Sequence, residues 1–213
     1  MPVYQGFADY ARTGAVAAAP LDAALASLDG AFYDPAGVLR AGVYDVYSTS
    51  SGDLTNTPLY DLAVTRANPK VLADAEPGDL RVAAKLRRDP SLRQTNNDST
   101  VVSDVVFTNI TGPTSALPVL TNVELVLLRA EALWGLGRDA ETLALVKVVR
   151  QRDGGLGARP AASFATCGAR LHEILRQKRF ALLFERGARL VDYRTFGLFS
   201  ELDARGGAVT CQP

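Results

Sequence analysis

The sequence predicts a mainly α-helical protein that has an irregular, loop-rich middle segment and few short strands. Three observations support this prediction: an alanine-rich start, two helical patterns joined by a very short turn, and a long apolar helical pattern near the C-terminus. The chain has 213 residues, of which 47% are hydrophobic, so it can bury a substantial core. We divide it into a helical start (1–29), a loop-rich middle (30–118) and a helical end (119–213), all within a single region (1–213).

The charge balance excludes several broad classes of protein. Lysine and arginine together number 23, as do aspartate and glutamate, so no net basic charge favours a nucleic-acid partner. No apolar run approaches the roughly 18 residues that span a bilayer. The first residues, MPVYQGFADY, lack the basic and apolar regions of a signal peptide. Any electrostatic function must therefore be local.

The residue pattern in the first half of the chain changes from helical to irregular. Residues 5–29 are alanine-rich and helical in pattern, and Pro20 either opens a second helix or kinks a single one. The stretch AGVYDVYS then alternates like a strand, and STSSGDLTNTP has the composition of a loop. The stretch NPKVLADAEPGDLR indicates short helical turns between prolines. We expect this middle segment to lie over the helices.

The next segment predicts a pair of antiparallel helices. Thr121 and Glu124 have the spacing of a capping box, in which the threonine hydroxyl accepts from a backbone N–H three residues on and the glutamate reaches back. Apolar residues then recur at three and four positions until Gly137, and Asp139 begins a second helix that runs to about Arg152. So short a turn makes an αα-hairpin, and this one resembles a single tetratricopeptide unit.

The last predicted helix carries charges where apolar residues are expected. In RFALLFERGARLVDYRTFG, Glu185 and Arg189 share a helical face with leucines. A buried carboxylate is costly unless it is paired, and Arg189 has the right spacing to pair with Glu185 if the helix continues past Gly187. We therefore predict a structural ion-pair network of Glu185, Arg189, Asp192 and Arg194. The alternative is a solvated helix end with ordinary surface pairs.

The sequence offers little catalytic or metal-binding chemistry. The single histidine, His172, lies beside Glu173 and away from the leucine stripe, so we expect a solvated side chain and not a catalytic base. GxSxG, HExxH and phosphate-loop motifs do not occur. Cys167 and Cys211 lack the spacing of a zinc site and are either a disulfide or two separate thiols. We expect no enzyme, metal or cofactor, and a hydrolase whose catalytic residues meet only in space is the weaker alternative.

Groups that bind small molecules gather in the middle segment. Sugars present apolar ring faces with polar rims, so aromatic rings, amides and carboxylates hold them. These groups occur together in one loop-rich stretch as Tyr44, Tyr47, Asp53, Asn56 and Tyr60. We treat these five as candidate ligand-binding residues, with core packing as the alternative for each tyrosine. Trp134 lies inside the predicted hairpin, where we expect it to pack in the core.

Two stretches in the second half resemble the C-terminal signature of the SusD/RagB family: ALPVLTNVELVLLRAEALWGLGR and LHEILRQKRFALLFERGARLVDYRTFG. Members of this family are surface nutrient-binding lipoproteins of outer-membrane uptake systems. Three upstream stretches resemble the family's middle segments in the same order: ALASLDGAFYD, GVYDVYSTSSGDLTN and RANPKVLADAEPGDLRVAAKL. The resemblance covers most of the chain.

The terminal motif departs from the family pattern at its edges. The family usually has Glu-Leu after the first aromatic residue, Glu-Gly after the second and two arginines after the aspartate. This chain has in those places Ala181-Leu182, Glu185-Arg186-Gly187 and Arg194-Thr195. The central charges are intact, and the resemblance therefore favours a retained but looser structural network.

The resemblance implies a largely helical, tetratricopeptide-like binding protein that is not an enzyme. Its implied partners are a TonB-dependent outer-membrane transporter and a glycan or other small nutrient, and its implied location is the outer-membrane surface. Such a compartment is oxidising, so the resemblance also implies that Cys167 and Cys211 pair. Members are much longer and begin with an export signal and a lipidated cysteine, so we interpret the chain as a C-terminal half whose N-terminal half is absent. The alternative is a tetratricopeptide-like module that binds a protein and no glycan.

Overall fold

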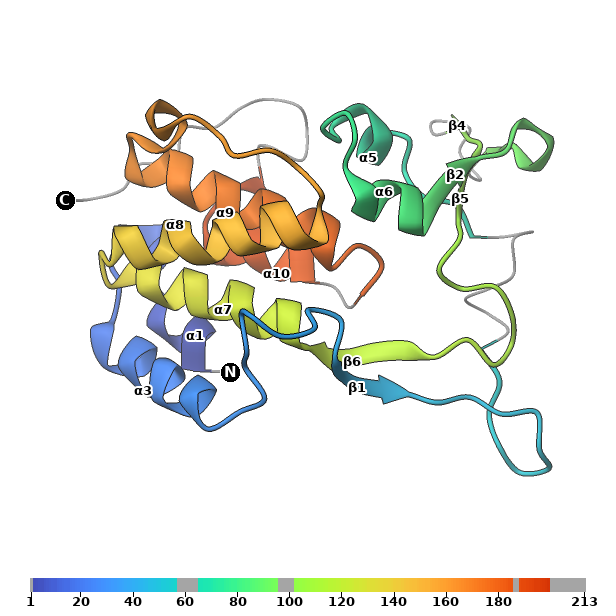
Figure 1. The fold of residues 1–213 in the computed structure, drawn as a ribbon, viewed down its shortest axis with the longest axis horizontal. Helices are drawn as coiled ribbons and strands as arrows, with labels where there is room; N and C mark the ends of the chain where they lie inside the picture. The colour runs from blue at the N-terminus through green and yellow to red at the C-terminus, as the bar shows by residue number, and fades with distance from the viewer. Residues whose placement is uncertain (1, 57–64, 96–101, 186–187, 200–213) are drawn as a thin grey trace.

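The computed structural model describes residues 2–56, 65–95, 102–185 and 188–199. Figure 1 shows a helical body on one side and a more irregular part, with the strands, on the other. The described helices are α1 (Pro2–Gly6), α2 (Tyr10–Thr13), α3 (Ala18–Asp29), α5 (Lys70–Ala73), α6 (Leu80–Lys85), α7 (Asn122–Gly135), α8 (Asp139–Val148), α9 (Cys167–Ala181) and α10 (Ala188–Thr195). Shorter helical turns are η1 (Pro90–Leu92), η2 (Val149–Asp153) and η3 (Ala161–Phe164). The mainly helical fold class is confirmed.

The helix pair predicted from periodicity is present as α7 and α8. The turn between them contains Gly137, whose φ of 70° lies in the left-handed region that glycine adopts without strain. Helix α9 packs against both members of the pair, while α1 and α3 pack on α7 from the other side (Figure 1). Helix α7 is therefore the centre of the body, and Ala130 and Trp134 are both buried in its core.

The start of α7 uses a different cap from the predicted one. Thr121 does occupy the N-cap position, but its hydroxyl makes no capping hydrogen bond and is buried without a hydrogen-bond partner. The backbone N–H groups of Asn122 and Val123 instead donate to the carbonyl oxygens of Ala41 and Leu39, at 2.8 Å each. The loop before β1 satisfies these donors, so the helix starts where the capping-box spacing predicts, but the predicted hydrogen bond to the threonine hydroxyl is absent.

The alanine-rich start forms three helices. Pro20 lies in the first turn of α3, so it helps to open a helix and does not kink one. The close approach of this start to α7 depends on Gly135, because a Cβ there would lie 2.6 Å from Leu21 Cδ1 and 2.7 Å from Phe7 Cζ. The rings of Phe7, Tyr10, Trp134 and Phe196 pack together, which joins the start of the chain to its last described turn.

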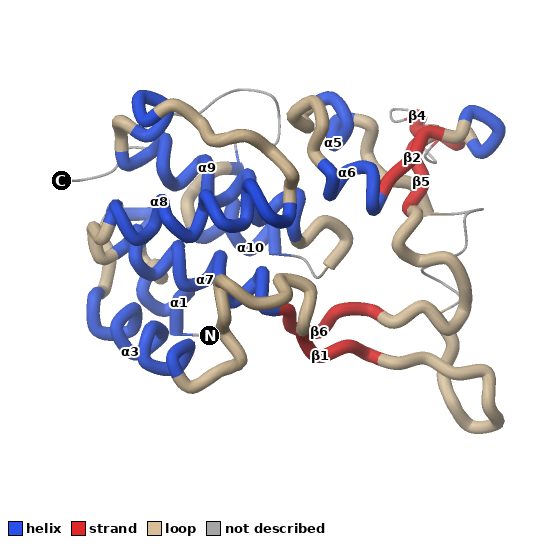
Figure 2. Tube along the Cα trace, viewed as in Figure 1, coloured by secondary structure: helices blue, strands red, loops and turns tan. Residues whose placement is uncertain are grey.

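The middle segment contains three small antiparallel ladders. Strand β1 (Gly42–Asp45) pairs with β6 (Leu117–Thr121), and β6 leads directly into α7 (Figure 1). The other two ladders join β2 (Leu86–Arg88) to β5 (Val105–Phe107) and β3 (Gln94–Thr95) to β4 (Val102–Ser103). Figure 2 shows the labelled strands to the right of the helical body, with long loops between the β1–β6 ladder and the other strands. AGVYDVYS does contain a strand, as its alternation predicts.

The last helix is broken within the stretch where the predicted Glu185–Arg189 pair requires it to continue. Helix α9 ends at Ala181, and α10 begins at Ala188. Between them Phe184 has a φ of 62°, which is strained for a bulky residue, and its ring stacks on Phe107 at 3.8 Å between centroids. Glu185 lies in this break and Arg189 lies in α10, so the two side chains do not share one helical face.

Candidate functional site

Four of the five predicted ligand-binding residues lie on a segment that we call the arm, residues 42–56, and all but Asn56 are at least partly exposed. The arm comprises β1 and the loop after it, and it extends away from the helical body (Figure 1). Tyr44 and Asp53 are exposed and Tyr47 is half-buried. The Tyr44 hydroxyl donates to the carbonyl oxygen of Arg40 at 2.6 Å, which fixes the ring on the ribbon while leaving the ring partly in solvent.

The arm also exposes aliphatic side chains. Val46 is 82% exposed and Leu54 is 79% exposed, and Val43 lies more than half in solvent on the same ribbon. Aromatic, aliphatic and acidic groups therefore occur together on one accessible segment, a mixture that suits the apolar faces and hydroxyl rims of sugars.

Asn56 does not offer its side chain to a ligand. It is 1% exposed, its backbone N–H donates to Pro113 O at 2.7 Å, and its amide Nδ2 donates to Ser115 O at 2.9 Å. These bonds hold the end of the arm against the loop before β6. Asn56 is therefore a supporting residue, while Tyr60 lies outside the described residues.

Glu185 is buried but has different partners from the predicted ones. Its carboxylate is 9% exposed, and Oε1 accepts from Lys85 Nζ at 2.6 Å and from Arg40 Nη1 at 3.1 Å. The predicted pair with Arg189 was wrong because the chain leaves the helix before Glu185. Lys85 also donates to the carbonyl oxygens of Ala181 and Leu183, so this contact ties the middle segment to the end of α9.

The other predicted network residues also have separate surroundings. Asp192 accepts from Lys178 Nζ at 2.6 Å, and Arg189 Nη2 donates to the hydroxyl of Tyr193 at 2.9 Å. Arg194 is exposed on α10. The four residues Glu185, Arg189, Asp192 and Arg194 therefore do not form one network.

Lys178 is the centre of a fully buried charge cluster. Its ammonium also donates to Glu131 Oε1 at 2.7 Å, so one cation serves two carboxylates from α7 and α10. Burial opposes its charge, but Glu131 and Asp192 outweigh burial and raise the pKa of Lys178. Burial raises the pKa of Glu131 to about 7, consistent with its second oxygen lacking a hydrogen-bond partner. Burial likewise raises the pKa of the nearby Tyr4 to about 12.

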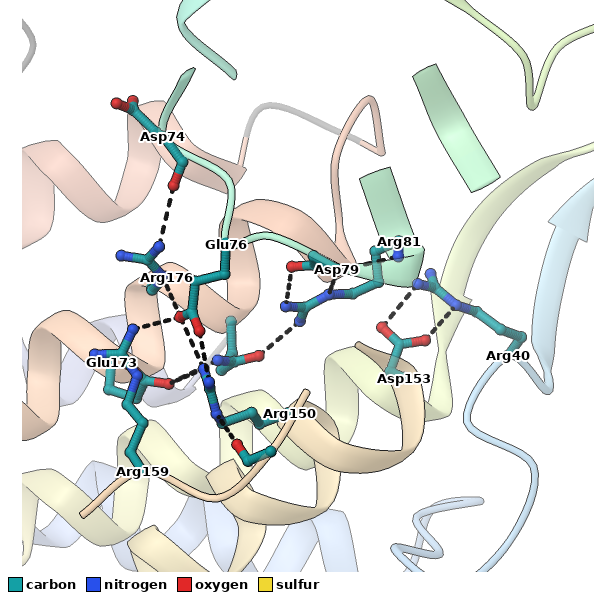
Figure 3. Close-up of polar contacts among 12 residues, drawn as sticks. Arg40, Asp74, Glu76, Asp79, Arg81, Arg150, Asp153, Arg159, Glu173 and Arg176 are labelled. Atoms are coloured by element: carbon teal, nitrogen blue, oxygen red, sulfur yellow. Dashed lines mark hydrogen bonds and ion pairs between the residues drawn. The ribbon is translucent and has the colours of Figure 1, made fainter. Parts of the chain in front are cut away.

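A second charge cluster, shown in Figure 3, was not found from the sequence. Glu76 lies in the loop between α5 and α6, and its carboxylate accepts hydrogen bonds from Arg150 Nη1 at 2.8 Å and Arg150 Nη2 at 2.5 Å. The same carboxylate also accepts a hydrogen bond from Arg159. Arg176 Nε lies 3.1 Å from the same carboxylate. The Arg150 hydrogen bonds are the largest cause that lowers the pKa of Glu76 to about 2. These partners are remote in sequence, so no local spacing could have indicated them.

The cluster continues along α9. Glu173 Oε1 accepts from the amide of Gln177 at 2.7 Å, and Gln177 Oε1 accepts from Arg81 Nη1 at 2.6 Å. Arg81 is in turn bonded to Asp79, with both side chains 1% exposed. The middle segment is thus joined to α9 by the buried Asp79–Arg81 pair, through the hydrogen bond from Arg81 to Gln177.

The structure contains an open groove of about 740 Å³ along α9. It is lined by residues of α9, by Val71 and Asp74 of the middle segment, and by Arg189 and Tyr193 of α10. Its lining contains five lysine or arginine side chains and three carboxylates. Of the predicted ligand-binding residues that the structure describes, Tyr44, Tyr47, Asp53 and Asn56, none lines it.

The remaining candidates add no reactive constellation. His172 is partly exposed at the groove, and Cys167 begins α9 while Cys211 lies outside the described residues, so their pairing stays a prediction. Within the described ranges, no cluster of three or more histidine, cysteine or acidic side chains is placed to hold a metal ion. Nor is any helix in these ranges long and apolar enough to cross a membrane.

Comparison with known proteins reveals relatives by fold only. No family model and no curated protein sequence matches the chain. The solved structure of B. fragilis NanU is similar with a TM-score of 0.56 and 17% identity, over 98% of this chain and 56% of NanU. A SusD superfamily protein from Bacteroides vulgatus ATCC 8482 aligns with a TM-score of 0.45 and 14% identity, over 72% of this chain and 35% of that protein. The chain thus spans little more than half the length of the first and about a third of the second.

Proposed function

We propose that this chain, whose fold is that of the SusD-like proteins, is a nutrient-binding component of an outer-membrane TonB-dependent uptake complex. The similarity to NanU over 98% of the chain is the observation that carries the proposal. The proposed ligand is a glycan or another small nutrient, and the proposed partner is a SusC-like transporter. The chain acts by binding and not by catalysis, and it works at the outer-membrane surface.

We assign the first contact with a neutral glycan to the arm. Tyr44 has its hydroxyl fixed by Arg40 O, so its ring is already oriented and loses little conformational freedom when a sugar stacks on it. Tyr47 and Asp53 lie farther along the same segment and supply a second ring and a hydrogen-bond acceptor. Asn56 supports the arm from within.

Calorimetric titration of the 213-residue chain with a panel of neutral oligosaccharides tests this assignment. We expect Tyr44→Ala to weaken binding by about threefold to tenfold, because a ring contact contributes roughly 0.5–1.5 kcal/mol. Phe32→Ala is the matched control, since Phe32 is an exposed ring outside the arm.

The same titration separates glycan binding from the alternative of a protein-interaction module. Equal binding by the Tyr44→Ala and Phe32→Ala variants would remove the arm from the proposal. If no oligosaccharide binds while a protein partner does, the interaction-module alternative is favoured.

A further inference from the structure

The groove along α9 contains a guanidinium that pairs with no carboxylate of the described residues. The three carboxylates in its lining are already engaged: Asp74 with Arg179, Glu173 with Gln177 and Arg150, and Asp192 with Lys178. Arg189 contacts the neutral hydroxyl of Tyr193 at 2.9 Å, and its guanidinium carbon lies 4.9 Å from the centre of that ring. Within the described part of the chain, Arg189 makes no contact with a carboxylate.

The position of Arg189 adds to the local positive potential. It lies in the first turn of α10, where the helix dipole contributes a partial positive charge. A cation in that turn is unfavourable by itself, and an anion placed beside it would be stabilised both by the dipole and by the guanidinium.

A second arginine faces the same space. Arg179 Nη1 is 2.7 Å from Asp74, while its Nε is buried without a hydrogen-bond partner. Burial is the main cause that lowers the pKa of Arg179, and the charge of Arg189 lowers it further. Both guanidinium groups line the same groove, and an anion bound there would be attracted to both charges.

The shape of the groove indicates an organic ligand. Its volume of about 740 Å³ is within the range of roughly 300–1,000 Å³ typical of small-molecule sites. Val71, Leu183 and Phe184 supply apolar surface beside the arginines. The planar fork of the Arg189 guanidinium matches the geometry of a carboxylate.

We propose that the groove along α9 binds a carboxylate-bearing ligand, with Arg189 pairing with the carboxylate, Arg179 beside it and the apolar wall contacting the ligand's body. This site shares no residue with the arm, so the inference goes beyond the proposed function and does not require the arm to bind glycans. In a nutrient-binding protein the site would extend the ligand range to acidic compounds.

The test uses trigalacturonate as the acidic probe and its methyl ester as an uncharged probe of the same sugar. Titration at low salt should show binding of trigalacturonate to the full chain and at least about tenfold weaker binding of the ester. Arg189→Gln should weaken trigalacturonate binding by at least about tenfold, because it removes a charge-assisted hydrogen bond. Arg194→Gln, an exposed arginine on the same helix and outside the groove, should leave the affinity unchanged.

Several outcomes would overturn the inference. These are absence of trigalacturonate binding, equal binding of acid and ester, unchanged affinity in Arg189→Gln, or competition by inorganic phosphate as strong as that by the uronate. Circular dichroism of Arg189→Gln must match the parent, and Arg189→Lys should restore part of the affinity because it returns the charge. The proposed function is tested separately, and it fails if the chain binds no neutral glycan through Tyr44.

Discussion

The buried Lys178 permits a sharp test of how the charged core stabilises this fold. Its Nζ lies 2.7 Å from Glu131 and 2.6 Å from Asp192, with side-chain exposures of 3%, 0% and 4% in the order Lys178, Glu131, Asp192. The substitution Lys178→Met keeps the length of the side chain and removes the charge. Both carboxylates then remain buried without their cation.

The expected loss follows from these contacts. Two charge-assisted hydrogen bonds at roughly 1.5–3 kcal/mol each give about 3–6 kcal/mol. Breaking a buried ion pair from one side costs about 3–5 kcal/mol. We therefore expect Lys178→Met to lower the free energy of unfolding by about 3–5 kcal/mol at neutral pH. The matched control is Lys70→Met, which removes the exposed Lys70–Asp74 pair and should cost about 0–1 kcal/mol.

The loss should also depend on pH with a defined sign. The folded pKa of Glu131 is raised from 4.5 to about 7, so the folded state holds this proton more tightly than the unfolded state. The free energy of unfolding therefore falls as the pH rises from the unfolded-state pKa of Glu131 to its folded-state pKa, and removing Lys178 strengthens this effect. The penalty of Lys178→Met should be smaller at acidic pH, where both carboxylates are protonated, than at neutral pH.

Urea titration followed by circular dichroism measures these quantities. Adding Glu131→Gln and Asp192→Asn to Lys178→Met should recover part of the lost stability, because the uncompensated charges are gone. A loss below about 1 kcal/mol, a loss independent of pH, or a triple variant no more stable than the single one would refute the reasoning.

Four further predictions concern other contacts. The pKa of Glu76 is lowered from 4.5 to about 2 in the folded state, so its contribution to the free energy of unfolding is present above pH 4.5 and is lost as the pH falls toward about 2. Glu76→Gln should remove that part of the acid dependence in urea titrations. Glu185→Ala should cost about 3–5 kcal/mol in denaturant titration if Lys85 stays buried without its carboxylate. Gly135→Ala should cost about 1–3 kcal/mol by overpacking, read from the same titration. Cys167 and Cys211 should pair in exported protein, and titration of two thiols would contradict this.

Local periodicity predicted the parts of the fold that depend on neighbouring residues. The αα-hairpin and the short strand in AGVYDVYS both follow from spacings within a few residues, and Gly137 marks the turn that its conformational freedom suits. The helix starts after Thr121 as predicted, but carbonyl groups some 80 positions upstream, from Leu39 and Ala41, accept its first two N–H groups, and no local spacing indicates these contacts.

The candidate site was less predictable because its contacts join distant segments. Glu185 pairs with Lys85, 100 positions earlier, and with Arg40, 145 positions earlier, and neither separation has a local signature. The break before Glu185 also released Arg189 from its predicted partner. The same break placed Arg189 in the wall of the groove, a role that helical spacing could not indicate.

The most direct test of an uptake component is purification of the chain from detergent-solubilised outer membranes of its source cells. The proposal predicts that a TonB-dependent transporter co-purifies with it in a fixed ratio and that this association persists after washing in high salt. Recovery of the chain from the outer membrane without any such transporter would contradict the proposal.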